Sequence, residues 1–263
     1  MQAAAAMPAA DPVPVVSYRS QGRLLIVGEP AMAMPWARLL ADTLQVSVLA
    51  PASDTASAKA GITLLHGEVV SLHGWLGAFE LEWTQGAASF DLVLDLQERP
   101  LFDMHLPPQG YFRVAEGAMS AAYVAKELVQ AVGEFEKPKY FAYDEKLCAH
   151  SRSKLQGCNR CIDVCSTVAI SSFGDKVKVE PHLCMGCGAC ASVCPSGAMR
   201  YNYPSVAYSG ERLKLMLGAY NRQATQRPTL LIHAESASGT LLADAHQPLS
   251  GVIPYAVHDV ASI

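Results

Sequence analysis

The sequence has 263 residues, a formal net charge of −4 at pH 7, 51% hydrophobic residues and 17% charged residues. These proportions indicate a globular protein with a sizeable core and exclude a disordered chain, and the small negative charge gives no support for nucleic-acid binding. No run reaches the roughly 18 apolar residues of a membrane-spanning helix, so we expect no membrane span. A chain of this length fits two domains.

The first 20 residues are rich in Ala and Pro and predict a flexible tail. They contain neither the basic start nor the long apolar core of a secretion signal. We therefore expect a cytoplasmic protein, in which clustered cysteines stay reduced and usually bind metal.

Residues 21–133 predict an α/β layer domain. The apolar run Arg23–Gly28 is typical of a buried parallel strand, residues 31–44 carry apolar side chains at helical spacing, and residues 45–49 predict a second strand. This β–α–β order indicates a small α/β layer. Further elements are expected in the order strand 62–65, a hairpin pair from 67–72 and 77–83, strand 90–96, and a helix at 117–132 that Gly133 ends.

A strand followed by Gly28 invites comparison with dinucleotide-binding domains. The fingerprint G-x-G-x-x-G is absent, however, because the turn reads Gly28-Glu-Pro-Ala-Met-Ala. The second strand ends in Leu49-Ala-Pro51, without the acidic residue that binds a ribose hydroxyl. We therefore expect a docking or scaffolding domain. A flavin or nicotinamide site in this domain is kept as the alternative.

All 8 cysteines lie between positions 148 and 194. The downstream run has the spacing C-x2-C-x2-C-x3-C-P, by which iron–sulfur clusters are held, and small residues in its gaps let the backbone curl around a cube. In such runs the fourth cysteine serves a second cluster, so a second run is expected. An upstream run with the spacing C-x9-C-x2-C-x3-C supplies it. The cysteines of the two runs are Cys148, Cys158, Cys161 and Cys165, and Cys184, Cys187, Cys190 and Cys194.

Two other uses of these cysteines are weighed against the clusters. Zinc sites tend to use separated pairs of ligands that close one tetrahedron, rather than three closely spaced ligands and a fourth. Disulfides belong mainly to secreted proteins, and nothing here indicates secretion. Two [4Fe–4S] clusters are the expected cofactors.

Residues 140–203, approximately, resemble the bacterial two-cluster [4Fe–4S] ferredoxins. The resemblance rests on both cysteine runs, the Gly174-Asp175 turn and the phrase Pro181-His-Leu-Cys-Met-Gly-Cys. It implies a pseudo-symmetric βαβ repeat in which each cluster takes one ligand from the other run. By this resemblance cluster one has the ligands Cys148, Cys158, Cys161 and Cys194, and cluster two has Cys184, Cys187, Cys190 and Cys165.

Two departures concern the upstream run. Nine residues separate Cys148 from Cys158, where family members usually have two, and Ser166 follows Cys165 where proline is common. The insertion either forms a loop or removes Cys148 as a ligand, in which case cluster one lacks an iron.

Residues 134–144 lead into Cys148 and resemble, more loosely, larger ferredoxin-like proteins associated with bacterial formate dehydrogenases. This resemblance implies an electron-transfer role beside a dehydrogenase. It also fits a module flanked by further domains.

The remaining residues, 205–263, predict a partial α/β segment that is either truncated or completed by another polypeptide. Met199–Tyr203 is expected to close the ferredoxin sheet. Ser209 is expected to cap a helix, because the following turn carries Glu211. Strands are expected at 229–233 and 252–257.

The sequence therefore predicts an α+β protein: an α/β layer domain (21–133), a pseudo-symmetric 2[4Fe–4S] module (134–204) and the C-terminal α/β segment. The expected function is electron transfer to or from a redox partner such as a dehydrogenase, with no catalytic residues. An iron–sulfur subunit of a flavin or nicotinamide enzyme, and a maturation or scaffold factor, remain alternatives. The cations Arg152, Lys154 and Arg160 are expected to steer an acidic partner toward cluster one.

Overall fold

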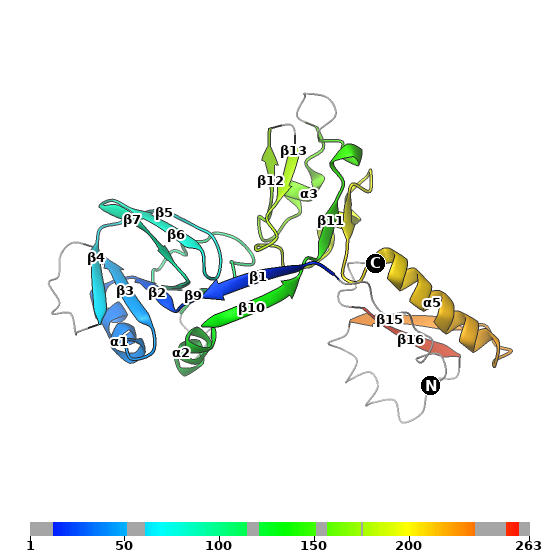
Figure 1. Cartoon of the computed structure of the whole chain (residues 1–263), viewed down its shortest axis with the longest axis horizontal. Helices are drawn as coiled ribbons and strands as arrows, with labels where there is room; N and C mark the ends of the chain where they lie inside the picture. The colour runs from blue at the N-terminus through cyan, green and yellow to red at the C-terminus, as the bar shows by residue number, and fades with distance from the viewer. Residues whose placement is uncertain are drawn as a thin grey trace. The chain divides into compact units, whose positions relative to one another are not determined.

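The computed structural model describes residues 13–51, 61–114, 121–150, 157–174, 176–234 and 251–257. The described residues form a mixed α/β structure with more strands than helices. The chain divides into two compact units (Figure 1). One comprises Val16–Lys137, and the other comprises residues 1–15 with residues 138–263. The α/β unit therefore extends past the expected boundary at residue 133.

The first unit is built on a five-stranded parallel sheet with the order β4-β3-β2-β8-β9. Its strands are β2 (Arg23–Val27), β3 (Gln45–Ala50), β4 (Ile62–His66), β8 (Leu92–Asp95) and β9 (Tyr111–Arg113). In the central strand β2, Leu24, Leu25 and Ile26 have no exposed surface. This continuous apolar run is expected for a parallel strand covered on both faces.

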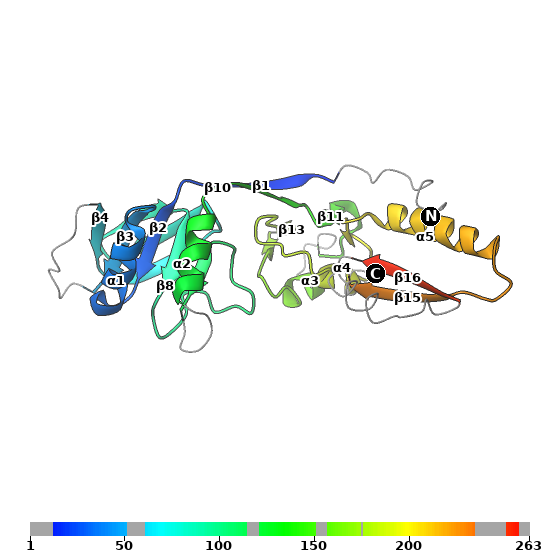
Figure 2. The same ribbon diagram turned by 90° about the horizontal axis from the view of Figure 1, so that it is seen from below.

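Different layers cover the two faces of this sheet. The helices α1 (Pro30–Leu40) and α2 (Ala121–Gln130) pack on the face that carries Leu24 and Ile26 (Figure 2). The other face carries Leu25 and packs against an antiparallel sheet of β5 (Val69–His73), β6 (Phe79–Trp83) and β7 (Gly86–Phe90). The expected hairpin is confirmed, since β5 and β6 pair antiparallel. The sequence did not indicate its third strand.

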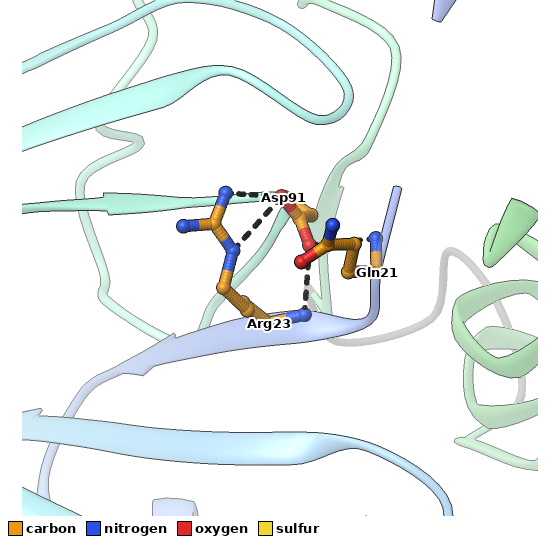
Figure 3. A network of polar contacts seen from close by, with 3 residues as sticks. All are labelled: Gln21, Arg23 and Asp91. Carbon is orange, nitrogen blue, oxygen red and sulfur yellow. Dashed lines mark hydrogen bonds and ion pairs between the residues drawn. The ribbon is translucent and has the colours of Figure 1, made fainter. Parts of the chain in front are cut away.

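The strand expected at 90–96 is divided between the two sheets, because Asp91 lies at a corner between β7 and β8. The Asp91 side chain is 1% exposed and binds Arg23 at the start of β2 (Figure 3). The guanidinium Nη2 and Nε donate to Oδ1 at 2.6 and 3.2 Å. The backbone N–H groups of Arg23 and Gln21 donate to Oδ2 at 3.0 and 2.8 Å. This network joins the edge where β2 and β8 begin.

Burial acts to raise the pKa of Asp91. Hydrogen bonds from Arg23 and Gln21, together with the Arg23 charge, outweigh burial and hold the pKa of this carboxyl below its ordinary value. The hydrogen bond to Asp91 in turn raises the pKa of Arg23. The pair is therefore ionised at neutral pH.

The expectation of a tail over residues 1–20 is wrong for its last part. Residues Val15–Ser20 form β1, which pairs with β10 (Gly133–Pro138). The reason is a two-residue alternation, since Val16 and Tyr18 are buried while their neighbours are exposed. The Lys137 ammonium lies 5.0 Å from the centre of the Tyr18 ring. Residues 1–12 lie outside the described part.

The C-terminal helix begins earlier than expected. It is α5 (Val206–Asn221), and its N-cap is Ser205, whose Oγ accepts a hydrogen bond from the Tyr208 N–H at 3.2 Å. Ser209 lies one turn inside the helix, so its assignment as the cap is wrong. Strands β15 (Thr229–Ala234) and β16 (Val252–Val257) form a parallel pair, and Tyr255 donates a hydrogen bond to the Ser209 carbonyl of α5.

Candidate iron–sulfur cluster site

All eight cysteines lie in a small region of strands and single-turn helices. Two antiparallel ladders frame it, β11 (Phe141–Tyr143) with β14 (Met199–Tyr201) and β12 (Ile170–Phe173) with β13 (Lys176–Val179). The single-turn helices are α3 (Arg160–Asp163) and α4 (Ala189–Ser192). The apolar core beneath the cysteines consists of Phe141, Ile170, Val177, Ala198 and Met199.

The same local structure occurs twice. In each run a single-turn helix contains the third cysteine, the fourth cysteine follows the helix, and a turn leads into a strand. The upstream run uses α3, Cys165 and β12, and the downstream run uses α4, Cys194 and β14. A repeat of this kind is what the ferredoxin resemblance implies.

None of the eight cysteines forms a disulfide. Burial raises the pKa of Cys161, and the nearby sulfurs of Cys148, Cys194 and Cys158 raise it further. Cys161 therefore lies among three cysteines, of which Cys194 comes from the other run. We call these four residues set one.

The second group of cysteines likewise combines three cysteines from one run with one from the other. Burial raises the pKa of Cys190 to about 12, with further contributions from Cys184, Cys187 and Cys165. Here Cys165 is the member from the other run, and we call these four residues set two. The ferredoxin resemblance implies the same two groups as cluster ligands, and that ligand role stays a prediction.

The raised pKa values also indicate that each set needs a compensating positive charge. Four thiolates brought together repel one another and are costly to bury, unless a cation compensates them. A bound metal supplies that charge and deprotonates its thiol ligands. Within the described residues, no three His, Cys, Asp or Glu side chains gather tightly enough to hold a single metal ion.

The loop of the downstream run depends on glycine. Gly186 and Gly188 have φ values of +76° and +75°, in the left-handed region. A Cβ on Gly186 would lie 2.7 Å from the Tyr140 ring, so the loop packs directly on this aromatic side chain. Burial raises the pKa of Tyr140, with contributions from Tyr203 and Cys184, which places its hydroxyl near set two. Sequence reasoning did not identify Tyr140. Its position within the Tyr-Phe-Ala-Tyr segment before Cys148 was the available signal.

Hydrogen bonds reach the sulfurs from neighbouring turns. The Met199 N–H donates to Cys194 Sγ at 3.4 Å, and the Ser196 hydroxyl lies 3.8 Å from the same sulfur. Burial acts to raise the pKa of Cys194, but these hydrogen bonds outweigh it and hold the pKa below its ordinary value. In the other run, Thr167 Oγ1 lies 3.5 Å from Cys165 Sγ. Such contacts stabilise thiolates and adjust the potential of a bound cluster.

A pocket of about 520 Å³ lies beside set one. Its wall includes Cys194 together with Val164, Val193, Asp163 and the exposed Arg160. Cys194 therefore borders the surface where a partner can approach. Of the three expected steering cations, Arg160 stands at this pocket, whereas Arg152 and Lys154 lie outside the described residues.

The α/β unit has one feature of nucleotide-binding domains. Counted along the chain, its five parallel strands lie in the order 3-2-1-4-5, which reverses direction between β2 and β8. Ligands of such sheets bind at the carboxyl ends of the strands beside this reversal. Here the Leu96 N–H donates to the Val27 carbonyl at 2.9 Å, and a Cβ on Gly28 would lie 2.9 Å from Leu96 Cβ. Gly28 thus accommodates Leu96, a buried side chain, at the position where a phosphate would approach.

A buried carboxylate at the same edge is satisfied within the chain. Asp95 accepts hydrogen bonds from the N–H groups of Gln97 and Leu101, at 2.9 Å each, and from the Tyr111 hydroxyl. Burial raises the pKa of Tyr111, and the hydrogen bond to Asp95 raises it further. Asp95 therefore anchors the loop that follows β8.

Residues 154–198 match the 4Fe-4S dicluster domain family. Indolepyruvate oxidoreductase subunit IorA of Pyrococcus horikoshii is 40% identical over 50 residues, 18% of this chain and 8% of that protein. Hydrogenase-4 component A of Escherichia coli is 46% identical over 39 residues, covering 15% and 19% of the two chains. Ferredoxin 7Fe of Hydrogenibacillus schlegelii is 38% identical over 39 residues, covering 15% and 50%. The chain thus spans half or less of each relative.

These similarities identify an iron–sulfur electron-transfer domain. The matched segment contains seven of the eight cysteines and leaves out Cys148. Among the described helices, none is both long and apolar enough to cross a membrane.

Proposed function

We propose that this protein carries electrons through two [4Fe–4S] clusters, to or from a larger oxidoreductase such as a formate dehydrogenase. The match of residues 154–198 to the 4Fe-4S dicluster domain family supports the electron-transfer role. The observation that carries the proposal is the grouping of the cysteines into set one and set two. Each set holds one cluster, with Cys194 and Cys165 exchanged between the runs.

The chain's own residues bind and adjust these clusters. When bound, each cluster supplies a one-electron redox couple. The cysteines fix its position, the core around Phe141 and Ile170 limits water, and the Met199 N–H stabilises negative charge on Cys194. Electron transfer of this kind requires no acid–base pair or activated nucleophile.

The iron count of cluster one has two candidate values. Cys148 lies outside the family match, and one relative is named Ferredoxin 7Fe, which suits a protein with one incomplete cube. In this chain Cys148 is 8% exposed and is one of the three cysteines that raise the pKa of Cys161. This proximity supports four ligands, and hence four irons, in cluster one.

A partner oxidoreductase is supported by the printed names of two relatives, an oxidoreductase subunit and a hydrogenase component. The choice of a formate dehydrogenase rests on the resemblance of residues 134–144 alone. A cytoplasmic location and a separate C-terminal segment at 205–263 likewise remain predictions from the sequence.

One alternative has an observation in its favour. The strand order of the α/β unit is typical of nucleotide-binding domains, so this unit is a candidate for holding a flavin or nicotinamide in an enzyme subunit. The contact of Leu96 with Gly28 favours the scaffolding role instead. Flavin absorption bands in the purified protein would support the enzyme.

Anaerobic reconstitution with iron and sulfide tests the proposal directly. Two cubes give about eight irons per chain, together with the EPR signals of reduced [4Fe–4S] clusters after chemical reduction. Stoichiometric zinc without iron would contradict it. Electron transfer from the reduced protein to a formate dehydrogenase then tests the proposed partner.

A further inference from the structure

The ligands of cluster one have an unusual spacing in the sequence. Two of its ligands, Cys148 and Cys158, are separated by nine residues, whereas Cys184 and Cys187 of cluster two are separated by two. Bringing together two ligands that lie farther apart along the chain costs more entropy. A contact that closes the connection near its ends would relieve that cost for the cluster.

The two ends of the insertion touch each other. A Cβ on Gly157 would lie 2.5 Å from the Ala149 carbonyl oxygen and 3.1 Å from the His150 Cα. Real Cβ atoms do not approach backbone this closely, so only glycine fits here. The chain that leaves the cluster at Ala149 and His150 therefore returns against itself at Gly157. This closed end, which we call the neck, consists of Ala149, His150 and Gly157.

A buried histidine holds the neck together. His150 is 3% exposed, its Nδ1 lies 3.2 Å from the Cys158 carbonyl oxygen, and its Nε2 lies 2.9 Å from Ser172 Oγ. A carbonyl oxygen only accepts, so Nδ1 carries the hydrogen, and in the neutral ring Nε2 accepts from the Ser172 hydroxyl. Ser172 belongs to β12, where it pairs with Val177 of β13. The histidine thus joins both ends of the insertion to a strand of the module.

We propose that His150 is a positioning residue for cluster one: by closing the neck with Gly157 and Ser172, it holds Cys148 beside Cys158 so that the cluster keeps four irons. This inference rests on the proposed two-cluster function. It accounts for a C-x9-C spacing in a module that usually needs C-x2-C. Along the closed neck, only Ala149, His150 and Gly157 separate the two ligands.

The test compares Cys148→Ala, His150→Ala and Gly157→Ala with the wild-type chain, all reconstituted anaerobically. Wild type is expected to hold about eight irons, and each variant about seven, with the EPR signal of an oxidised three-iron cluster. His150→Asn places an amide near the Nδ1 position and is expected to restore much of the eighth iron. Gly210→Ala, at a glycine with open space around it, is the matched control and is expected to keep eight.

The outcomes separate the inference from the proposed function. A wild-type protein without two clusters defeats the function itself. The positioning role is overturned if the wild type holds eight irons and the His150→Ala and Gly157→Ala variants also hold eight. In that case the potential of cluster one in these variants is also unchanged. Retention of eight irons by Cys148→Ala overturns it as well, because Cys148 is then not a ligand. An unchanged cluster-two signal in each variant shows that the module has folded.

Discussion

Val168 and Gly197 occupy the same position in the two ligand turns, three residues after Cys165 and Cys194 respectively, and both adopt left-handed backbone conformations with φ values of +51° and +66°. In each turn their N–H donates to the carbonyl of the preceding cysteine, at 3.1 and 3.4 Å. Glycine adopts this conformation freely, but a β-branched residue is strained in it. The ligand turn therefore imposes its geometry on Val168.

We predict that Val168→Asn stabilises the cluster-loaded protein by about 1 kcal/mol, because asparagine tolerates the left-handed region. Little burial is lost, since Val168 is 58% exposed. Denaturant unfolding under anaerobic conditions measures the change. Val168→Ile, which remains β-branched, is the control and should not stabilise. Equal stability of the Asn and Ile variants would show that the turn is unstrained.

Acid stability should depend on Asp91, whose pKa lies below its ordinary value in the folded chain. A depressed pKa contributes stability that is complete above the unfolded pKa of about 3.9 and is lost as pH falls through the folded value. Asp91→Asn removes this contribution at every pH. The variant should be less stable by about 2 kcal/mol near neutral pH, and the difference from wild type should shrink below about pH 4.

Urea unfolding at neutral and acid pH measures this difference. Glu80→Gln, at an exposed position of β6, is the matched control and should change stability by no more than about 0.5 kcal/mol. A difference between wild type and Asp91→Asn that stays constant with pH would contradict the role of the Asp91 charge.

The α/β unit should not bind NAD(H) or NADP(H) tightly. Leu96 packs against Gly28 at the reversal of strand order, and β3 ends in Ala50 without an acidic residue for a ribose. Calorimetry with each nicotinamide is expected to show no binding in the micromolar range. Micromolar binding that is abolished by Gly28→Val would overturn this prediction.

Electron exchange with a dehydrogenase partner should slow as salt rises. Arg160 is exposed at the pocket that includes Cys194, where its charge can steer an acidic partner. The Debye length falls to about 8 Å at physiological ionic strength, so steering weakens with added salt. Arg160→Glu should slow the exchange further without changing the iron content, and adding the Arg152→Glu and Lys154→Glu changes should extend the effect.

Lys178→Glu is the control, because it changes the net charge equally at an exposed position of β13. If both charge reversals have the same effect, or if neither salt nor charge matters, the partner does not approach through this pocket.

Local patterns predicted much of the α/β unit, whereas the ligand sets of the two clusters came from the ferredoxin resemblance and stay a prediction. The run Arg23–Val27 and the alternation at residues 79–83 carry their own periodicity, and ligand spacing constrains the cluster loops. Strand β7 was missed because Gly86-Ala-Ala-Ser has low strand propensity and is held by pairing with β6. The short strand β9 was also missed.

Contacts between distant residues account for the remaining differences. Asp91 forms a corner within an apolar run because it binds Arg23, 68 positions earlier in the chain. Tyr140 becomes part of the site only because the glycine loop folds onto its ring. The neck likewise depends on Ser172, which lies 22 positions after His150. Such pairs are set by tertiary packing, which the local sequence pattern does not specify.

The central claim is that each cluster takes one ligand from the other run. EPR spectra of reduced Cys165→Ser and Cys194→Ser, compared with those of Cys161→Ser and Cys190→Ser, test it most directly. Set two contains Cys165 and Cys190, so these two variants should perturb the same cluster. Set one contains Cys194 and Cys161, and their variants should share the other perturbation. If Cys165→Ser instead matches Cys161→Ser, each run holds its own cluster and the account is contradicted.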